Sequence, residues 1–74
     1  HCILEDYVTI NPGVTISSNV RVGTQTMIGA GSVIRDGISI GRNCVIGMGS
    51  VVLKDLPDDV VAYGNPCVVV KTNG

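Results

Sequence analysis

An aliphatic side chain returns at every sixth residue along most of this chain. Counting in steps of six from residue 4 meets nine aliphatic residues in succession, and they are Leu4, Ile10, Ile16, Val22, Ile28, Ile34, Ile40, Ile46 and Val52. Because 24 of the 74 residues are Ile, Leu or Val, nine such matches have a chance probability of about 4 in 100,000. The sequence therefore contains a true six-residue repeat.

Each repeat divides into a short strand and a turn. Four residues after each aliphatic position lies a small or aliphatic residue that can also point inward, so residues 8–10 form a strand with inward, outward and inward side chains. The remaining three residues form a turn, and its last residue is usually Gly, Asn or Asp, which tolerate a positive φ. Sharp corners are therefore predicted at Gly13, Asn19, Gly31, Gly37, Asn43, Gly49 and Asp55.

Strands this short cannot bury their inner face as hairpins, so the chain must coil. Three strands per coil make a three-sided prism with about 18 residues between stacked positions, which places Ile10, Ile28 and Ile46 in one column. We predict an all-β fold, a parallel β-helix of about three 18-residue coils over residues 1–57. A short C-terminal extension, residues 58–74, adds a loop and a strand.

Composition excludes several classes of function. The net charge is −1 and the five basic residues are scattered, which argues against a nucleic-acid partner. Apolar runs are too short to span a membrane. Three cysteines without a CxxC motif and a single histidine give no metal-ligand set, and they are typical of reduced thiols. We therefore expect a cytoplasmic protein with no metal, no membrane and no nucleic acid.

Two segments of the repeat point to a known family. The runs IGAGSV at residues 28–33 and IGMGSV at residues 46–51 resemble the hexapeptide-repeat acyltransferases, whose fold is a left-handed β-helix. Residues 2–23 and the tail over residues 51–71 look like bacterial sugar acyltransferases related to sialic acid O-acetyltransferase and the UDP-amino-sugar acetyltransferases. The resemblance implies transfer of an acyl group from acetyl-CoA to an amine or hydroxyl of a sugar or nucleotide-sugar.

The outward strand positions predict how copies of the chain associate. One face of the prism shows Thr9, Met27 and Val45 and a second shows Thr15, Val33 and Val51, whereas the third shows Arg21 and Ser39. Exposed apolar residues on two faces are typical of an interface. A cyclic trimer covers both faces with one repeated contact, and the family resemblance implies the same assembly. We therefore predict a homotrimer.

The resemblance also implies a catalytic centre near the N-terminus. In that family a histidine two residues before a cysteine acts as general base, whereas this chain reads His1-Cys2. The base therefore either lies upstream of the given sequence, or is His1 in a shifted register, or is absent. Because Cys2 falls inside a repeat that has already begun, we expect further residues and an N-terminal domain before it. The backbone amide of Ser18 matches the position that stabilises the oxyanion.

Coenzyme-binding residues are carried over from the same resemblance. Thr9 and the corner residues Ala30 and Met48 match positions that contact the coenzyme, and Gly29 and Gly47 lie at the same corner. For the glycines two interpretations stay open, one being corner geometry alone and the other the close approach of an extended pantetheine arm. At the nucleotide end, the matching residues are Gly64, Asn65, Pro66 and Lys71. The alternative for residues 64–66 is that they only turn the chain.

Two other classes of function are alternatives to an acyltransferase. The first is a trimeric β-helix that acts as a scaffold or binding module without catalysis. The second is metal-dependent hydration by a β-helix of the carbonic anhydrase type, which needs several histidines around zinc. The single histidine argues against this second class.

Overall fold

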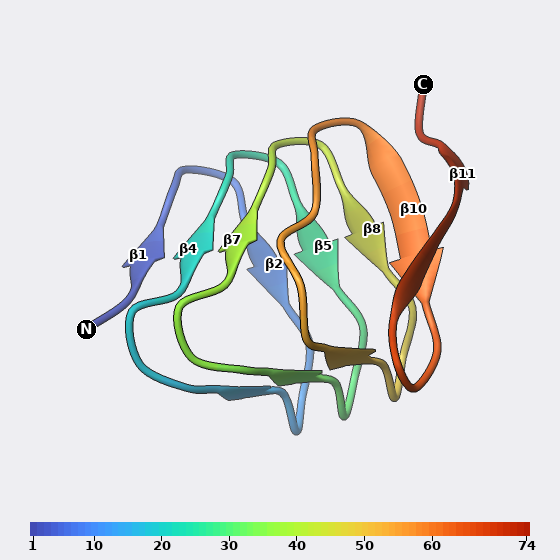
Figure 1. The fold of residues 1–74 in the computed structure, drawn as a ribbon. Coiled ribbons are helices and arrows are strands. Elements are labelled where there is room, and N and C mark those ends of the chain that lie inside the picture. Colours follow the sequence, from blue (N-terminus) through green and yellow to red (C-terminus); the bar gives the residue numbers. More distant parts are fainter.

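The computed structural model, which describes all 74 residues, contains eleven strands and no helix (Figure 1). The strands are β1 (Ile3–Leu4), β2 (Thr9–Ile10), β3 (Thr15–Ile16), β4 (Arg21–Val22), β5 (Met27–Ile28), β6 (Val33–Ile34), β7 (Ser39–Ile40), β8 (Val45–Ile46), β9 (Val51–Val52), β10 (Val60–Tyr63) and β11 (Val68–Thr72). The first nine follow the six-residue repeat, and their stacking confirms the predicted β-helix.

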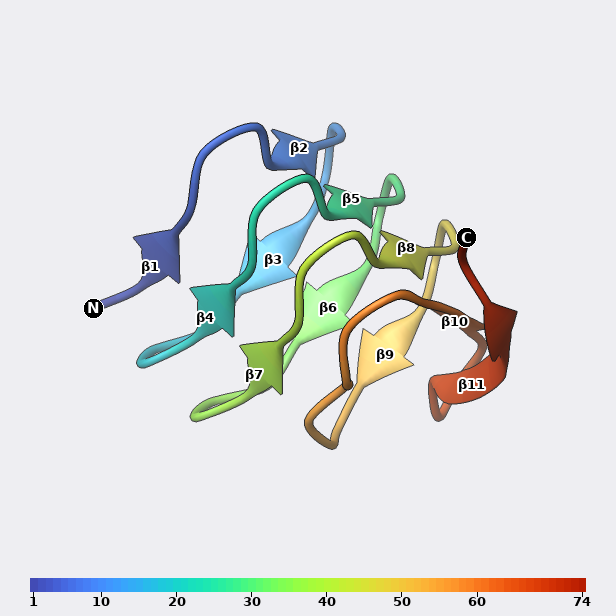
Figure 2. The same cartoon turned by 90° about the horizontal axis from the view of Figure 1, so that it is seen from above.

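Three sheets form the sides of the prism. Face A consists of β1, β4 and β7, face B of β2, β5, β8 and β10 with β11 at its edge, and face C of β3, β6 and β9. On face B, Ile10 pairs with Ile28 and Ile28 with Ile46, as the 18-residue spacing predicts. Viewed from the N-terminus along the prism, the chain turns counter-clockwise as it recedes, so the coil is left-handed (Figures 1 and 2).

The strands are shorter than the sequence indicates. Two residues pair in each of the first nine strands, whereas three were predicted. The first inward residue of each repeat lies at the corner, where its carbonyl still extends the ladder; Thr9 N–H, for example, donates to the carbonyl oxygen of Thr26 at 2.9 Å. Slanted hydrogen bonds of this kind are typical of parallel pairing. The inward and outward directions of the side chains are unaffected.

Corner conformations agree with the prediction at six of the seven predicted positions, Asp55 being the exception. Tyr7 and Gln25, which are not residues that favour a positive φ, adopt φ values of 63° at the equivalent corners. Asp55 is not among the residues with positive φ, so that prediction is wrong. The reason is a change in the length of the coil.

The last coil is two residues shorter than the others. Leu56 bridges to Ile40 and Ala62 pairs with Ile46, so 16 residues instead of 18 separate these stacked positions. Asp55 therefore does not end a standard turn. Its carboxylate Oδ1 instead accepts a hydrogen bond from the backbone N–H of Ser39 at 2.8 Å.

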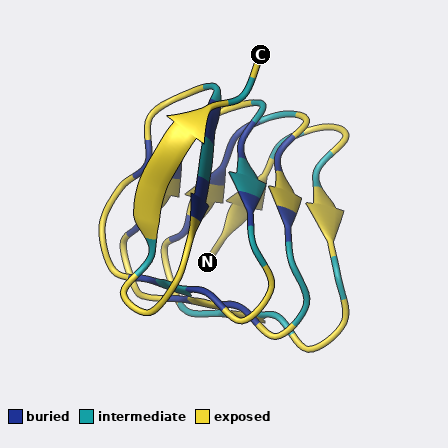
Figure 3. Ribbon diagram, turned by 90° about the vertical axis from the view of Figure 1, so that its right-hand side faces the viewer, coloured by how far each residue is buried: buried dark blue, intermediate teal, exposed yellow.

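The core runs along the prism axis and is open at the N-terminal end. Ile28, Ile34, Ile40, Ile46 and Val52 are at most 1% exposed. Leu4 and Ile10 occupy the same inward columns on the first coil of this structure, where they are 48% and 37% exposed. Figure 3 shows the same gradient, with buried segments in the later coils and exposed ones in the first.

The C-terminal residues close the other end of the prism. β10 adds a fourth parallel rung to face B, and β11 then returns antiparallel to β10. Asn73 fastens the end of the chain, because its side-chain amide donates to the carbonyl of Asn43 at 2.8 Å and its backbone N–H to the carbonyl of Asp59. The division into a prism and a closing segment at residue 57 stays a prediction, and the parallel stacking continues to Ala62.

An ion pair on the first two coils gives a testable titration. The hydrogen bond from the Arg21 guanidinium, and next the one from the Thr24 N–H, lower the pKa of Glu5 below its ordinary 4.5. The pKa of Glu5 is lower in the folded state than in the unfolded state. The ionised Glu5 therefore stabilises the fold fully above the unfolded-state pKa, and this stabilisation is lost as the pH falls through the folded-state pKa. We expect an NMR titration to place Glu5 below 4.5 and Arg21→Ala to raise its midpoint. An unchanged midpoint in that variant would contradict the assignment.

Candidate functional site

Turns stack along the three edges of the prism and define its corners. The AB corner consists of residues 5–7, 23–25, 41–43 and 57–59, the BC corner of residues 11–13, 29–31 and 47–49, and the CA corner of residues 17–19, 35–37 and 53–55. Residues 64–66 follow β10 and lie on the BC corner, because the Gly64 carbonyl accepts the Val51 N–H at 3.0 Å.

Most of the predicted coenzyme residues meet at the BC corner. The structure stacks Ala30 and Met48 on successive coils there, with residues 64–66 above them. Thr9 lies on β2, at the first rung of face B, and pairs with Met27. Met48 is 77% exposed. Ala30, Met48 and residues 64–66 are thus neighbours along one edge of the molecule, whereas Thr9 lies on the adjoining face.

Glycine is favoured at this corner for two different structural reasons. A Cβ on Gly29 would lie 2.7 Å from Gly47 C and from Met48 Cα, and a Cβ on Gly47 would lie 2.6 Å from Tyr63 Cβ. What approaches these two glycines is therefore the next coil of the same chain. Gly31 has a φ of +74° and a Cβ there would meet nothing within 4 Å. This last turn position therefore faces open space, and glycine is favoured there by the positive φ.

Substitutions at the two ends of one turn are expected to differ. Gly29→Ala would force apart two coils whose obstructing atoms are backbone, and we expect a loss of about 3 kcal/mol or more in the free energy of unfolding. Gly31→Ala only places an alanine in the left-handed backbone conformation, which lowers the free energy of unfolding by about 1–2 kcal/mol. Urea unfolding of both variants measures the difference. Equal losses would show that stacking does not constrain Gly29.

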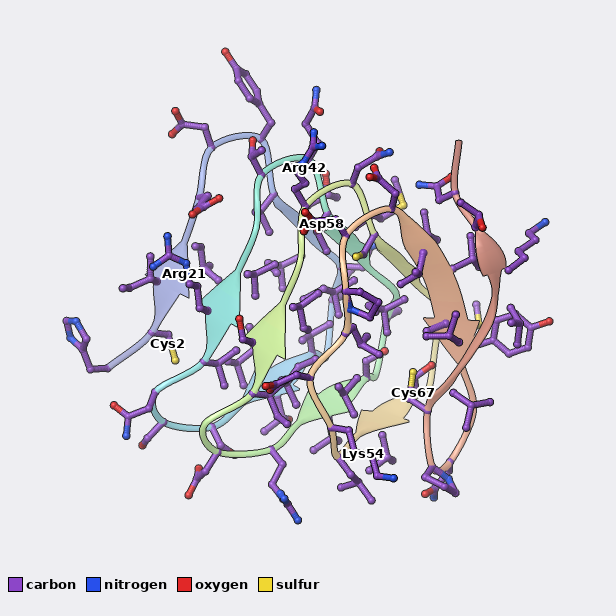
Figure 4. All side chains as sticks on the ribbon, turned by 45° about the horizontal axis from the view of Figure 1, so that its top comes forward. Cys2, Arg21, Arg42, Lys54, Asp58 and Cys67 are labelled. Carbon is purple, nitrogen blue, oxygen red and sulfur yellow. The ribbon has the colours of Figure 1, made fainter.

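The BC corner also differs from the other two in charge and hydrogen bonding. None of the five basic and six acidic side chains lies on it. At the other corners carboxylates accept backbone amides, as Glu5 does from Thr24 at 3.0 Å and Asp58 from Arg42 at 2.9 Å; Figure 4 shows Arg42 and Asp58 side by side. The amides of Ala30 and Met48 donate to no acceptor in the chain. In this they differ from the amides of Ser18, Thr24 and Arg42 at the other corners, which donate to carboxylates.

The two predicted catalytic groups lie at the CA corner. The Cys2 thiol donates to the Ser17 carbonyl at 2.9 Å, which places the N-terminal residues below the first turn of this corner. His1 is exposed, and no side chain hydrogen-bonds its imidazole. The Ser18 N–H donates to Asp36 Oδ1 at 3.1 Å, so the predicted oxyanion donor is already hydrogen-bonded to a carboxylate. Asp36 was not singled out from the sequence, although it lies 18 residues after Ser18 and therefore stacks above it.

The CA and BC corners lie at opposite ends of face C. The six residues from one turn to the next span at most about 20 Å of extended chain. Within one copy, His1 and Ser18 are therefore separated from Ala30 and Met48 by the width of a face. The isolated chain also contains no pocket. One copy of the chain does not bring the two halves of the predicted site together.

Lys71 and Cys67 belong to the closing segment. Lys71 is exposed on β11 opposite Val61 and forms no ion pair in the chain. Cys67 precedes β11 (Figure 4), and burial raises the pKa of its thiol. All three cysteines are free. No group of three or more His, Cys, Asp or Glu side chains is arranged to hold a metal ion.

No helix in the structure has the length and hydropathy needed to cross a bilayer.

Comparison with known proteins agrees with this geometry. Residues 1–36 match the family model of the bacterial transferase hexapeptide, described as six repeats, and residues 19–54 match that of the hexapeptide repeat of succinyl-transferase. A galactoside O-acetyltransferase of Lactococcus lactis is 46% identical over 66 residues, which are 89% of this chain and 23% of the relative. This chain therefore spans about a quarter of that relative's length.

Solved structures share the fold over nearly the whole chain. A maltose O-acetyltransferase from Clostridium difficile superposes with a TM-score of 0.95 at 38% identity, covering 99% of this chain and 49% of that one. The acetyltransferase domain of PglB from Neisseria gonorrhoeae, in complex with acetyl coenzyme A, gives 0.92 at 35% identity, covering 93% and 34%. The repeat, the left-handed prism and these matches together show that the chain belongs to the bacterial transferase hexapeptide-repeat family.

Proposed function

We propose that this chain is the β-helix of an acetyl-CoA-dependent sugar acyltransferase. The observation that carries the proposal is the BC corner, where the unpaired amides of Ala30 and Met48 stack on successive coils of an uncharged edge. Successive coils lie about 4.8 Å apart, so an extended pantetheine arm can follow the edge and accept both hydrogen bonds. A solved relative with this fold is described in complex with acetyl coenzyme A.

The remaining coenzyme contacts lie on the same edge and on the adjoining face B. Thr9 offers an exposed hydroxyl on the first rung of face B, and Gly29 and Gly47 let the turns that carry Ala30 and Met48 stack closely on one another. Gly64, Asn65 and Pro66 continue the edge toward the C-terminal end. Lys71, on β11 opposite Val61, supplies an unpaired cation on face B for the anionic nucleotide portion, where an ammonium acts as a point charge on phosphate.

The reaction uses the groups of the CA corner. His1, the only imidazole in the chain, accepts the proton of the sugar hydroxyl or amine as the oxygen or nitrogen bonds to the thioester carbonyl carbon. The Ser18 amide donates to the carbonyl oxygen as negative charge develops on it. The carbon–sulfur bond then breaks, and the sulfur leaves with the proton that His1 returns. Asp36 has to turn away from Ser18 for this step.

We propose a homotrimer, because the two halves of the site lie at opposite ends of face C. In a cyclic trimer the CA corner of one copy can meet the BC corner of the next. The outward residues Met27 and Val33 are 46% and 38% exposed on faces B and C, as an interface between copies requires. The acceptor is a sugar or nucleotide-sugar, and the three free thiols fit a cytoplasmic location.

Acetyl-CoA binding tests the function directly. We expect calorimetry of the folded trimer to show one site per chain, and a thiol-release assay to show turnover with at least one of galactosides, maltose or UDP-amino sugars. Met48→Glu places a charge on the uncharged edge at a 77% exposed position, so it should fold normally and bind acetyl-CoA at least about tenfold more weakly. A folded wild-type trimer that releases no heat with acetyl-CoA would reject the proposal.

A scaffold without catalysis is the second candidate. The observation that favours it is the hydrogen bond from the Ser18 N–H to Asp36, which occupies the predicted oxyanion donor. This candidate predicts a trimer that neither binds acetyl-CoA nor releases thiol. The calorimetric experiment therefore separates the two functions.

A further inference from the structure

Ser50 lies on the third coil, at the point where the closing loop stacks on it. Its side chain is fully buried, and its hydroxyl donates to the Gly47 carbonyl at 2.6 Å. The same hydroxyl oxygen accepts the backbone N–H of Gly64 at 3.3 Å. Ser50 therefore links the turn that carries Met48 to the loop that follows β10.

Ser32 provides an internal comparison one coil below. It is equally buried and donates to the same Gly47 carbonyl, at 3.1 Å. Ser32 makes no hydrogen bond to the closing loop. Of the two stacked serines, only Ser50 connects the third coil to residue 64.

Two backbone hydrogen bonds complete the attachment of the closing loop. The Val51 N–H donates to the Gly64 carbonyl at 3.0 Å, and the Cys67 N–H donates to the Val51 carbonyl at 2.9 Å. These bonds and that of Ser50 hold residues 64–67 beside the third turn of the BC corner. After this loop β11 pairs antiparallel with β10, and Asn73 then attaches the chain to the AB corner.

We propose that Ser50 is a positioning residue that fixes the loop of residues 64–67 against the Met48 turn, and that this placement sets the affinity for the acyl donor. The effect on acyl-donor affinity rests on the proposed function. Ser50 is fully buried, so it acts through the loop and not by touching a ligand. The uncharged edge is continuous from Ala30 to Pro66 only while the loop stays in this position.

Hydrogen exchange tests the positioning without any assay of activity. In Ser50→Ala, we expect the amides of Val51 and Cys67 to exchange at least tenfold faster, although neither of their hydrogen bonds involves the Ser50 side chain. Ser32→Ala is the matched control and should leave both rates within twofold of wild type. Unchanged exchange in Ser50→Ala, or equal acceleration in both variants, would overturn the proposal.

Steady-state kinetics with acetyl-CoA test the effect of Ser50 on the affinity for the acyl donor. Ser50→Ala should raise KM for acetyl-CoA about tenfold with kcat within twofold, and Ser32→Ala should change neither. A matched fall in kcat in both variants would contradict a positioning role for Ser50. If the wild-type trimer itself binds no acetyl-CoA, the proposed function fails and the effect on affinity with it, whereas the exchange experiment still decides whether Ser50 positions the loop.

Discussion

Ile28→Asp is expected to abolish folding. Ile28 is fully buried between Ile10 and Ile46 in the face B column. The substitution removes about 1.5–3 kcal/mol of burial and adds an unpaired carboxylate, whose desolvation costs several kcal/mol more. Total stabilities of domains are about 5–15 kcal/mol, and a chain this short has a small core. Far-ultraviolet circular dichroism should show loss of the strand signal.

Met27→Asp is the matched control for this experiment. Met27 is the neighbouring residue of the same strand, but it points outward and is 46% exposed. The variant should keep the strand spectrum and, if Met27 lies in the interface between copies, lose the trimer. A folded Ile28→Asp variant would show that the inward columns do not hold the prism together.

Ser18→Pro is expected to lower kcat by about 10²–10³-fold, because it deletes the amide proposed to stabilise the oxyanion. Proline fits the middle position of this kind of turn, as Pro12 shows in the first turn of the BC corner. The substitution also removes the hydrogen bond from the Ser18 N–H to Asp36, which contributes about 1–3 kcal/mol to folding. The trimer should therefore still assemble.

Ser18→Ala keeps the backbone amide and is the control for the proline variant. Its kcat should stay close to that of wild type, since Ser18 contributes only its N–H to the proposed reaction. Steady-state thiol release with saturating acetyl-CoA measures both variants. If Ser18→Pro turns over as fast as Ser18→Ala in an active enzyme, the oxyanion donor is another group.

The inward columns could be predicted from the sequence because they depend on one periodic property. An inward residue at every sixth position stacks only if the chain coils with about 18 residues per turn, so Ile10, Ile28 and Ile46 were placed correctly. The shortened last coil could not be predicted in this way. Leu56 is aliphatic and fits either inward position of a repeat, and its pairing with Ile40 depends on how the chain passes the final corner.

The candidate site was only partly predictable. The grouping of Ala30, Met48 and residues 64–66 on one edge followed from the repeat and the family resemblance. The contact between Ser18 and Asp36 was missed, because no motif marks it and only the 18-residue spacing could have suggested it. The two different reasons for glycine at positions 29 and 31 also required coordinates, since both residues look alike in the repeat.

By itself, the sequence determined the period, the identity of the inward residues and the positions of most corners, because these are properties of neighbouring residues that the chain repeats locally. Only the tertiary structure decided which amides stay free, which carboxylates accept hydrogen bonds from a neighbouring coil, and how many residues the last coil contains. Those outcomes depend on atoms brought together across coils, where a shift of two residues or a rotation of one turn changes every partner. The hydrophobic pattern is compatible with such shifts as long as the inward side chains remain buried.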